Sequence, residues 1–356
     1  TTQEFYFYTK NNKLLYISLR NLRNSKNANK TTGDIMKKIS ILAFISAISI
    51  AFWGCGENKT QQQDVYKVKF AHVVSANTPK GQAADFFAKR VDELSQGKIK
   101  VEVFPSAQLV DDDKVFQELS RNNVQMAAPS FSKFTPIAKE FNIWDIPFLF
   151  RDTEHLHKVM DGEVGQILKD IISKRGIVAL NYWDAGFKQF STNKKPIIIP
   201  EDAKGQKMRI MSSKVLEEQT KALGAIPQVL PFSEVYSALS TGVVDAAENP
   251  LSNLYNSKFY EVQSSITLSN HGYLGYLVVV SDGFWKQLPD DLKEIFKQAL
   301  HEATEFERTQ SAKEEKVLLD KLKKDDATKT EIIELTDEQV AQWKEKMQAI
   351  YPKFYE

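Results

Sequence analysis

From Val65 to the C-terminus, short segments with strand character alternate with longer amphipathic segments typical of helices. Residues 65–74 alternate apolar and polar side chains, as in a half-buried strand. Thr78 and Pro79 then open a helix, because threonine is a good N-cap and proline suits the first helical position. A second strand is expected over residues 98–104. This alternation predicts an α/β protein whose sheets are mostly parallel.

The same alternation continues to a long helix near the C-terminus. Residues 290–324 contain few helix breakers and no sustained heptad repeat, which predicts a surface helix and not a coiled coil. Thr336 caps a final helix. Further helices are expected from Asp111–Asp113 to about Asn122 and over residues 153–174, 213–223 and 233–240. Further strands are expected over residues 124–128, 177–183, 187–192, 226–230, 243–247 and 271–281.

Composition and charge narrow the class of protein. The chain has 356 residues, of which 42% are hydrophobic and 26% charged, which suits a globular protein of about two domains. The formal net charge of +1 is uneven, because residues 1–55 hold eight Lys or Arg and two Asp or Glu. The remainder holds 39 basic and 44 acidic residues, a net charge of −5. A mildly acidic body without basic tracts argues against nucleic-acid binding.

The N-terminal region has the pattern of an export signal. Residues 36–55 begin Met36-Lys37-Lys38, continue as a short apolar run and end at Gly54-Cys55, which predicts a secretory signal peptide. Residues 1–35 precede the first Met and are interpreted as upstream sequence absent from the natural product. Cys55 is the one cysteine of the sequence, so a disulfide framework is excluded. Its position at the end of the apolar run resembles a bacterial lipid-attachment site. The alternative is simple cleavage of the signal peptide nearby. Residues 56–64 are polar and predict a tether.

The sequence contains few residues in patterns typical of catalysis. His155 and His157 lie two positions apart on an expected helix, so they diverge and cannot share a metal ion. The sequence lacks a nucleophile elbow, a phosphate-binding loop and a zinc-binding helix motif. Asp245 and Glu248 are the one candidate carboxylate pair, with a helix cap and a salt bridge as the alternative interpretation. We therefore expect no metal and no cofactor.

Cationic residues give a stronger indication of a binding site. Arg209 lies on a short expected strand just before an expected helix. At that position its guanidinium could bind a carboxylate through two parallel hydrogen bonds. The alternative interpretation is an exposed arginine at a sheet edge. Lys80 lies in the first turn of the helix capped by Thr78. A cation at this end of a helix is unfavourable because it opposes the helix dipole, but together with the free backbone amides it can form an anion-binding site. The alternative interpretation is that Lys80 is a flexible surface lysine.

Three further residues have both a structural and a binding interpretation. Lys188 lies between apolar neighbours on an expected strand, either as a charge that protects a sheet edge or as a ligand contact. Phe232 follows Pro231 and belongs either to the core or to a pocket wall. Asn249 precedes Pro250 at the end of a strand, where it either forms a turn or faces the crevice at the carboxyl ends of the strands.

Seven segments, in order and spacing, resemble the DctP family of extracytoplasmic solute receptors of TRAP (tripartite ATP-independent periplasmic) transporters. The resemblance runs from about Tyr66 to the C-terminus. The segments are FAHVVSANTPKG (70–81), KIKVEVFPSAQL (98–109), QMAAPS (125–130), WDAGFKQF (183–190), KGQKMRI (204–210), LPFSEVYSALSTGVVDAAENP (230–250) and KFYEV (258–262).

The resemblance implies a periplasmic binding protein fold. Two α/β lobes are joined by hinge strands and a long connecting helix, and they close on a ligand. The expected lobes are residues 65–187 plus 275–310 and residues 188–274 plus 311–356.

The resemblance also implies the ligand contacts. Arg209 pairs with the carboxylate of an organic acid, Phe232 lies over the ligand and Asn249 hydrogen-bonds it. Lys188 lies at the position where many family members have a second arginine. A lysine ammonium is a point charge, so it cannot bind a carboxylate through two parallel hydrogen bonds as a guanidinium does. The segment around Lys80 resembles the branch that takes C4-dicarboxylates, which makes Lys80 a contact for a second carboxylate. Weaker contacts or pocket-edge positions are expected at Ser130, Ser212, His72 and Trp183.

The sequence therefore predicts a periplasmic receptor that captures succinate, fumarate or malate and delivers it to a membrane permease without covalent chemistry. A receptor for a monocarboxylate, keto acid or aromatic acid is the alternative within the class. A periplasmic enzyme that uses Asp245 or Glu248 is the alternative from another class. A protein that hands its ligand-bound state to a sensor kinase is a third alternative, and lipid anchoring at Cys55 stays open.

Overall fold

The computed structural model describes residues 7–8, 14–15, 65–324 and 329–355. The signal peptide, Cys55 and the tether predicted above lie outside the described residues. The first unit, residues 1–63, contributes the short antiparallel pair β1 (Phe7–Tyr8) and β2 (Leu14–Leu15). The second unit, residues 64–356, contains the α/β body.

The body contains two separate mixed sheets, which define two lobes. The sheet of lobe I has the order β4-β3-β5-β12-β6, and the sheet of lobe II has the order β13-β11-β7-β10-β8-β9. Lobe I contains β3 (Tyr66–Ala71), β4 (Ile99–Phe104), β5 (Met126–Ala127), β6 (Ile177–Phe187) and β12 (Tyr273–Ser281). Lobe II contains β7 (Gln189–Thr192), β8 (Lys207–Ile210), β9 (Ile226–Val229), β10 (Ala246–Asn249), β11 (Ser265–Leu268) and β13 (Glu331–Glu334).

Both sheets are mixed, so the expectation of mostly parallel sheets holds only in part: five strand pairs of the described body are parallel and four are antiparallel. In lobe I, β3 pairs parallel with β4 and β5, whereas β12 pairs antiparallel with both β5 and β6. In lobe II, β7 pairs antiparallel with both β10 and β11. Four of the strands in these antiparallel pairs, β6, β7, β11 and β12, flank the two points where the chain changes sheet.

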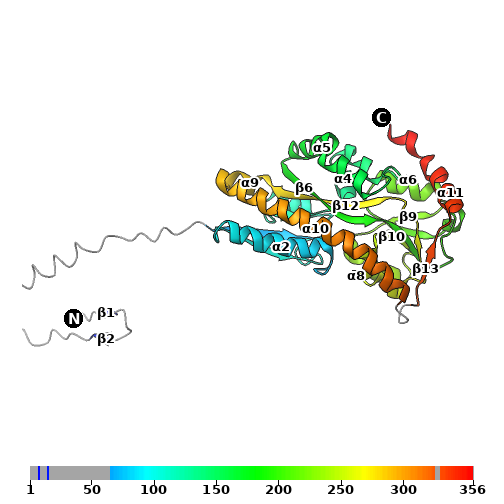
Figure 1. Cartoon of the computed structure of the whole chain (residues 1–356), viewed down its shortest axis with the longest axis horizontal. Helices are drawn as coiled ribbons and strands as arrows, with labels where there is room; N and C mark the ends of the chain where they lie inside the picture. Colours follow the sequence, from blue (N-terminus) through cyan, green and yellow to red (C-terminus); the bar gives the residue numbers. More distant parts are fainter. Residues whose placement is uncertain (1–6, 9–13, 16–64, 325–328, 356) are drawn as a thin grey trace, which may run out of the picture. The chain divides into compact units, whose positions relative to one another are not determined.

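The chain passes from lobe I to lobe II at Lys188, between β6 and β7, and returns between β11 and β12. The backbone N–H of Lys188 donates to the carbonyl of Gly272 at 2.8 Å, which joins the two crossings. The long helix α10 (Asp290–Lys324) has the predicted bounds. It lies beside α2 (Pro79–Leu94) in lobe I and beside α8 (Leu251–Asn256) in lobe II (Figure 1).

The remaining helices cover the sheets. The α-helices are α3 (Val115–Ser120), α4 (Thr153–Asp161), α5 (Glu163–Ser173), α6 (Lys214–Ala222), α7 (Val235–Ser240), α9 (Asp282–Gln287) and α11 (Asp337–Gln348). The 3-10 segments are η1 (Phe131–Phe134), η2 (Lys139–Asp145), η3 (Pro200–Ala203), η4 (Phe232–Glu234), η5 (Phe259–Val262) and η6 (Tyr351–Phe354). The core of lobe I packs Phe70 and Phe87 against Phe296 of α10 and Trp183 of β6.

Two local predictions differ from the structure for steric or bonding reasons. The helix expected over residues 153–174 is interrupted at Gly162, where a Cβ atom would lie 2.6 Å from the carbonyl oxygen of Lys158. The helix expected to be capped by Asp111–Asp113 begins at Val115, with Lys114 at the cap position and no side-chain cap bond there. Ser233 and Lys133 instead donate to the carboxylates of Asp111 and Asp113, respectively. Thr78 and Thr336 cap their helices as predicted.

Candidate functional site

Segments from the two lobes meet at the carboxyl ends of β5, β8 and β10. Ser130 follows β5 and forms an isolated bridge with Tyr276 of β12 in lobe I. Arg209 lies on β8 and Asn249 ends β10 in lobe II. Because β8 and β10 pair in parallel, their carboxyl ends lie at the same edge of the sheet.

A small cavity of about 20 Å³ lies between these segments. A space of this size holds about one water molecule, so the lobes are closed around it. Hydrogen bonds across the junction keep the lobes together: Thr135 Oγ1 donates to Ser212 O at 3.1 Å, and Ser233 Oγ donates to Asp111 Oδ2 at 2.7 Å. The lining residues are Val74, Asp112, Ser130, Lys133, Arg209, Met211, Phe232, Asn249, Asn253, Leu274 and Tyr276.

Arg209 is the cation of lobe II in the cavity wall, with only 2% of its surface exposed. Its Nε and Nη2 atoms donate to the carbonyl of Leu230 at 3.1 and 2.8 Å, which fixes the plane of the guanidinium. Nη1 has no hydrogen bond to any residue in the described part of the chain. Burial lowers the pKa of Arg209 to about 10, although the charge of Glu248 opposes this shift, so the side chain stays charged at neutral pH. The Phe232 ring lies 5.9 Å from the guanidinium carbon.

Asn249 has an unsatisfied side chain at the same cavity. It is 1% exposed, and neither its amide nitrogen nor its amide oxygen has a hydrogen-bond partner among the described residues. Leaving a buried polar group unpaired costs about 1–3 kcal/mol, so such a group calls for an explanation. A bound ligand that both donates and accepts, or one that recruits water, would satisfy it.

Lys80 is also buried, although it is not among the residues that line the cavity. The side chain of Thr78 accepts from the backbone of Gly81 at 3.2 Å, which fixes the first turn of α2 and the position of Lys80. Lys80 Nζ donates to Ala128 O at 3.0 Å and lies 3.5 Å from the centre of the Tyr276 ring. Burial lowers the pKa of Lys80 to about 8, partly offset by the charge of Asp112.

Lys188 occupies a different environment from the one expected of a ligand contact. Its ammonium forms a buried ion pair with Glu248, with 2.6 Å between Nζ and Oε1. Glu248 Oε2 accepts from Gln219 at 3.0 Å and lies 2.8 Å from His271 Nε2. Lys188 is not among the cavity-lining residues, so its charge is used within lobe II.

The alternative catalytic pair is not assembled as a pair in the described structure. Asp245 Oδ2 accepts from the backbone of Lys207 at 2.9 Å, at the start of β8. Glu248 is held by Lys188, Gln219 and His271. Each carboxylate therefore has its own structural partners, and neither is among the cavity-lining residues.

The four weaker candidates are distributed around the junction. Ser130 lines the cavity and its Oγ atom lies 3.3 Å from Met211 Sδ, across the lobe junction. Ser212 contributes to the lobe contact described above. Trp183 donates from Nε1 to Thr304 Oγ1 at 3.0 Å and belongs to the hinge core under α10. His72 is 1% exposed, and within the described chain its ring nitrogens lack partners; burial and the charge of Lys80 lower its pKa to about 3.

Sequence reasoning missed several members of the cavity wall, above all Lys133, Asp112, Tyr276 and Asn253. Asp112 is buried beside two lysines, and burial raises its pKa while the charges of Lys80 and Lys133 lower it in part. Lys133 comes three positions after Ser130, beyond the end of a predicted strand. That position was the available signal, because side chains at strand carboxyl ends face the crevice in α/β sheets.

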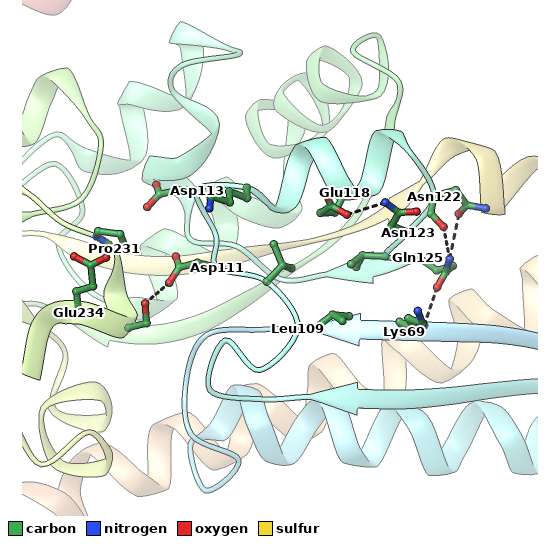
Figure 2. Close-up of a pocket in the computed structure, with 14 residues that line it drawn as sticks. Lys69, Leu109, Asp111, Asp113, Glu118, Asn122, Asn123, Gln125, Pro231 and Glu234 are labelled. Atoms are coloured by element: carbon green, nitrogen blue, oxygen red, sulfur yellow. Dashed lines mark hydrogen bonds between the residues drawn. The ribbon is translucent and has the colours of Figure 1, made fainter.

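A larger groove of about 760 Å³ is lined by residues of both lobes (Figure 2). Asp111 and Asp113 line it from lobe I, and Pro231 and Glu234 line it from lobe II. Asp112, between the two aspartates in sequence, lines the inner cavity. The segment of three aspartates therefore contributes side chains to both spaces.

The described residues contain neither a metal-binding cluster nor a membrane-spanning helix. Among these, no group of His, Cys, Asp and Glu side chains is arranged to hold a metal ion. Within the same residues, each helix is too short or too polar to span a bilayer.

Residues 70–356 match the DctP family model, described as bacterial extracellular solute-binding protein, family 7. The chain belongs to this family. The family and the two-lobed α/β fold predicted from the sequence are thus confirmed.

Three relatives illustrate the similarity. The C4-dicarboxylate-binding periplasmic protein DctP of Rhodobacter capsulatus is 44% identical over 290 residues, which cover 81% of this chain and 86% of that protein. A TRAP periplasmic solute binding protein from Sulfurospirillum deleyianum, crystallised with bound succinate, is 60% identical with a TM-score of 0.81, covering 82% of this chain and 95% of that chain. A TRAP periplasmic solute binding protein from Shewanella oneidensis, also with bound succinate, is 43% identical with a TM-score of 0.79. The match covers 82% of this chain and 94% of that chain.

Proposed function

We propose that this DctP-family protein captures a C4-dicarboxylate such as succinate, fumarate or malate and delivers it to the membrane permease of a TRAP transporter. One observation carries the proposal. Arg209 and Asn249 lie in the wall of a closed cavity between the lobes, each with hydrogen-bonding capacity unused within the described chain. Relatives that share the fold, at 60% and 43% identity, were crystallised with succinate.

In this proposal, each cavity residue has a role. The guanidinium of Arg209 binds one carboxylate, since charge-assisted hydrogen bonds in a buried site are the strong kind. Asn249 hydrogen-bonds the ligand, Phe232 covers it and Ser130 adds a polar contact. The lobes hinge at Lys188 and at residues 269–272, and the ligand favours closure because its contacts to both lobes exist only in the closed form.

Lys188, His72 and Trp183 take supporting roles in this proposal. Lys188 holds Glu248 in place next to Asn249. His72 and Trp183 belong to the packed interior of lobe I and its hinge. None of these three residues is among those that line the cavity in the described structure.

We place the protein in the periplasm, as the names of its relatives and the predicted signal peptide indicate. Lipid attachment at Cys55 stays a prediction, and Cys55 lies outside the described residues. A sensor kinase as a second partner stays a prediction, and a pull-down with the permease against such a kinase tests it.

A thermal-shift panel tests the ligand. A ligand at about 100 times its Kd raises the free energy of unfolding by about 2.7 kcal/mol. We expect this shift with at least one C4-dicarboxylate and none with the matched monocarboxylates. A shift with a monocarboxylate, keto acid or aromatic acid alone would assign the protein to the alternative ligand class.

A second measurement separates a receptor from an enzyme. Mass spectrometry of the ligand before and after incubation should show the same compound, because a receptor returns its ligand unchanged. Conversion that is lost in Asp245→Asn or Glu248→Gln would support the enzyme alternative.

A further inference from the structure

The long helix α10 is fixed to lobe I near its midpoint, close to the hinge. Asp184 of β6, four positions before the crossing at Lys188, donates from its backbone N–H to Glu307 Oε2 at 2.9 Å. Next to this contact, Trp183 Nε1 donates to Thr304 Oγ1 at 3.0 Å. Because α10 continues beyond this point to α8 of lobe II, these contacts determine where the hinge helix lies on lobe I.

Asp184 and Glu307 form a pair of carboxyl groups that is almost completely removed from solvent. Asp184 is 3% exposed and Glu307 is 0% exposed. The hydrogen bond from the backbone of Asp184 brings the Glu307 carboxyl close to the carboxyl of Asp184 itself. Within the described chain, Asp184 Oδ1 and Glu307 Oε1 have no hydrogen-bond partner. Two adjacent buried carboxylates cannot both stay ionised unless cations compensate them, so the partners of this pair have to be accounted for.

The nearest cations do not neutralise both carboxyl groups. His157 Nε2 lies 2.8 Å from Asp184 Oδ2, and the side chain of His157 is 26% exposed. Arg308 follows Glu307 on α10, but its two terminal nitrogens donate to the carboxylate of Asp161 on α4 at 2.7 and 2.9 Å. In the described chain, Glu307 therefore accepts one backbone N–H and has neither an ammonium nor a guanidinium group within hydrogen-bond distance.

More distant charges leave this balance in place. Lys80 of α2 adds a positive charge, but its ammonium donates to Ala128 O at 3.0 Å. Glu315, further along α10, adds a negative charge that acts on Asp184. Burial, followed by the charge of Asp184, raises the pKa of Glu307 well above its usual value, although the backbone hydrogen bond and the nearby cations oppose this shift. The ionisable groups that face the pair are His157 and Asp161 of α4, Tyr273 and Tyr276 of β12, Lys80 of α2, and Arg308 and Glu315 of α10.

We propose that Asp184 and Glu307 share one proton, and that this proton holds the middle of α10 against the last strand before the hinge. The proton lies between the two oxygens that have no other partner in the described chain, so it removes one negative charge and satisfies both atoms. His157 contacts Asp184 and is partly exposed, which gives the proton a route to solvent.

The shared proton makes the anchor of the hinge helix sensitive to pH. When the proton leaves at alkaline pH, two adjacent carboxylates repel each other at the contact between α10 and β6. Neither Asp184 nor Glu307 is among the residues that line the cavity between the lobes. The proton site is therefore separate from the ligand contacts.

Infrared spectroscopy tests whether the proton is present at neutral pH. The spectrum of the wild type minus that of Glu307→Gln should contain the C=O stretch of a protonated carboxyl group at pH 7. Glu305→Gln is the matched control, because Glu305 is an exposed glutamate on the same helix, and its difference spectrum should lack this band. In Asp184→Asn the band should disappear at a lower pH than in the wild type, because Glu307 no longer faces a negative charge.

Urea denaturation between pH 6 and pH 9 tests whether the proton stabilises the fold. The folded protein keeps a proton on Glu307 that the unfolded chain has already released, because the ordinary pKa of a glutamate is 4.5. The stability of the wild type should therefore fall as the pH rises through this range. Glu307→Gln has an amide in place of the protonated acid, so its urea midpoint should rise relative to that of the wild type as the pH increases. Glu305→Gln should follow the wild type.

Three results would overturn the proposal. A difference spectrum of wild type and Glu307→Gln without the acid band would show that Glu307 is ionised. A band that titrates identically in Asp184→Asn would show that the proton is not shared. Parallel urea profiles of the wild type and Glu307→Gln would show that the proton does not anchor the helix.

A second measurement covers the case in which Glu307→Gln does not fold. Nuclear magnetic resonance of wild-type protein labelled with ¹³C at the glutamate carboxyl groups should show a signal that stays in the protonated position at pH 7. In Asp184→Asn, this signal should move to the ionised position at a lower pH. Wild-type protein in which every glutamate signal is in the ionised position at pH 7 would exclude the shared proton.

Discussion

Lys188 Nζ lies 2.6 Å from Glu248 Oε1, and both side chains are almost completely removed from solvent. Lys188 is the residue at which the chain leaves lobe I, and Glu248 lies on β10, one position before Asn249. The backbone of Lys188 also binds Gly272 at the return crossing. The ion pair therefore connects both hinge segments to the strand that ends in the cavity.

Breaking this ion pair should destabilise the protein strongly. Lys188→Met leaves the carboxylate of Glu248 buried without its ammonium partner, which typically costs about 3–5 kcal/mol in free energy of unfolding. Urea denaturation followed by circular dichroism measures this change. Lys194→Met is the control, since Lys194 is exposed and 3.9 Å from Asp245; a pair of that kind contributes about 0–1 kcal/mol. Equal costs for the two variants would show that the buried pair does not stabilise the hinge.

Replacing Arg209 should remove most of the ligand affinity. Arg209→Ala leaves a ligand carboxylate unpaired in a buried cavity, at a cost of about 2–5 kcal/mol in binding free energy. Arg209→Lys should also bind weakly, because a lysine cannot hold Leu230 O and present a further donor in one plane. Calorimetric titration with succinate measures both, and urea denaturation checks that each variant is folded. Wild-type affinity in both variants would exclude Arg209 from the binding site.

Local signals in the sequence predicted much of the fold. Thr78 and Thr336 cap their helices, and α10 has the predicted bounds, because caps and long helical periodicity depend on neighbouring residues. Arg209 lies on a short strand, as expected, and the structure places it in the cavity wall. Strand direction depends instead on which distant strands pair, so the mixed sheets and the strands β11 and β13 were not predicted.

The site was harder to predict because its residues converge from distant segments. Lys133 and Ser212 are 79 positions apart, and Lys188 and Glu248 are 60 apart. From the sequence, Lys188 had two equal interpretations, since the partner that neutralises it is remote in the chain. Nothing in the local sequence predicted that the backbone of Gly162 is extended, which divides the expected helix into α4 and α5.

The buried imidazole of His72 should make stability depend on pH. Its pKa is lowered to about 3 in the folded protein by burial and by the charge of Lys80, against about 6.5 in the unfolded chain. Between these values the unfolded state binds more protons, so stability is complete above pH 6.5 and falls as the pH drops toward 3. We expect His72→Phe to reduce this slope in urea denaturation between pH 7 and pH 4. The exposed His301→Ala serves as control, and an unchanged slope in His72→Phe would contradict the assignment.

Replacing Asn249 should separate ligand binding from stability. Asn249→Leu has a similar volume and removes an amide that makes no hydrogen bond within the described chain, so the ligand-free protein should be no less stable than wild type. Its affinity for succinate should nevertheless fall, because the ligand loses an amide contact. Asn256→Leu is the matched control, since the Asn256 amide donates to Ser252 O at 2.9 Å and Asn256 is not among the cavity-lining residues. We expect that variant to lose about 1 kcal/mol of stability and to keep its affinity. If Asn249→Leu instead loses stability and binds succinate normally, then Asn249 is a structural residue and the cavity's ligand contacts must be reassigned.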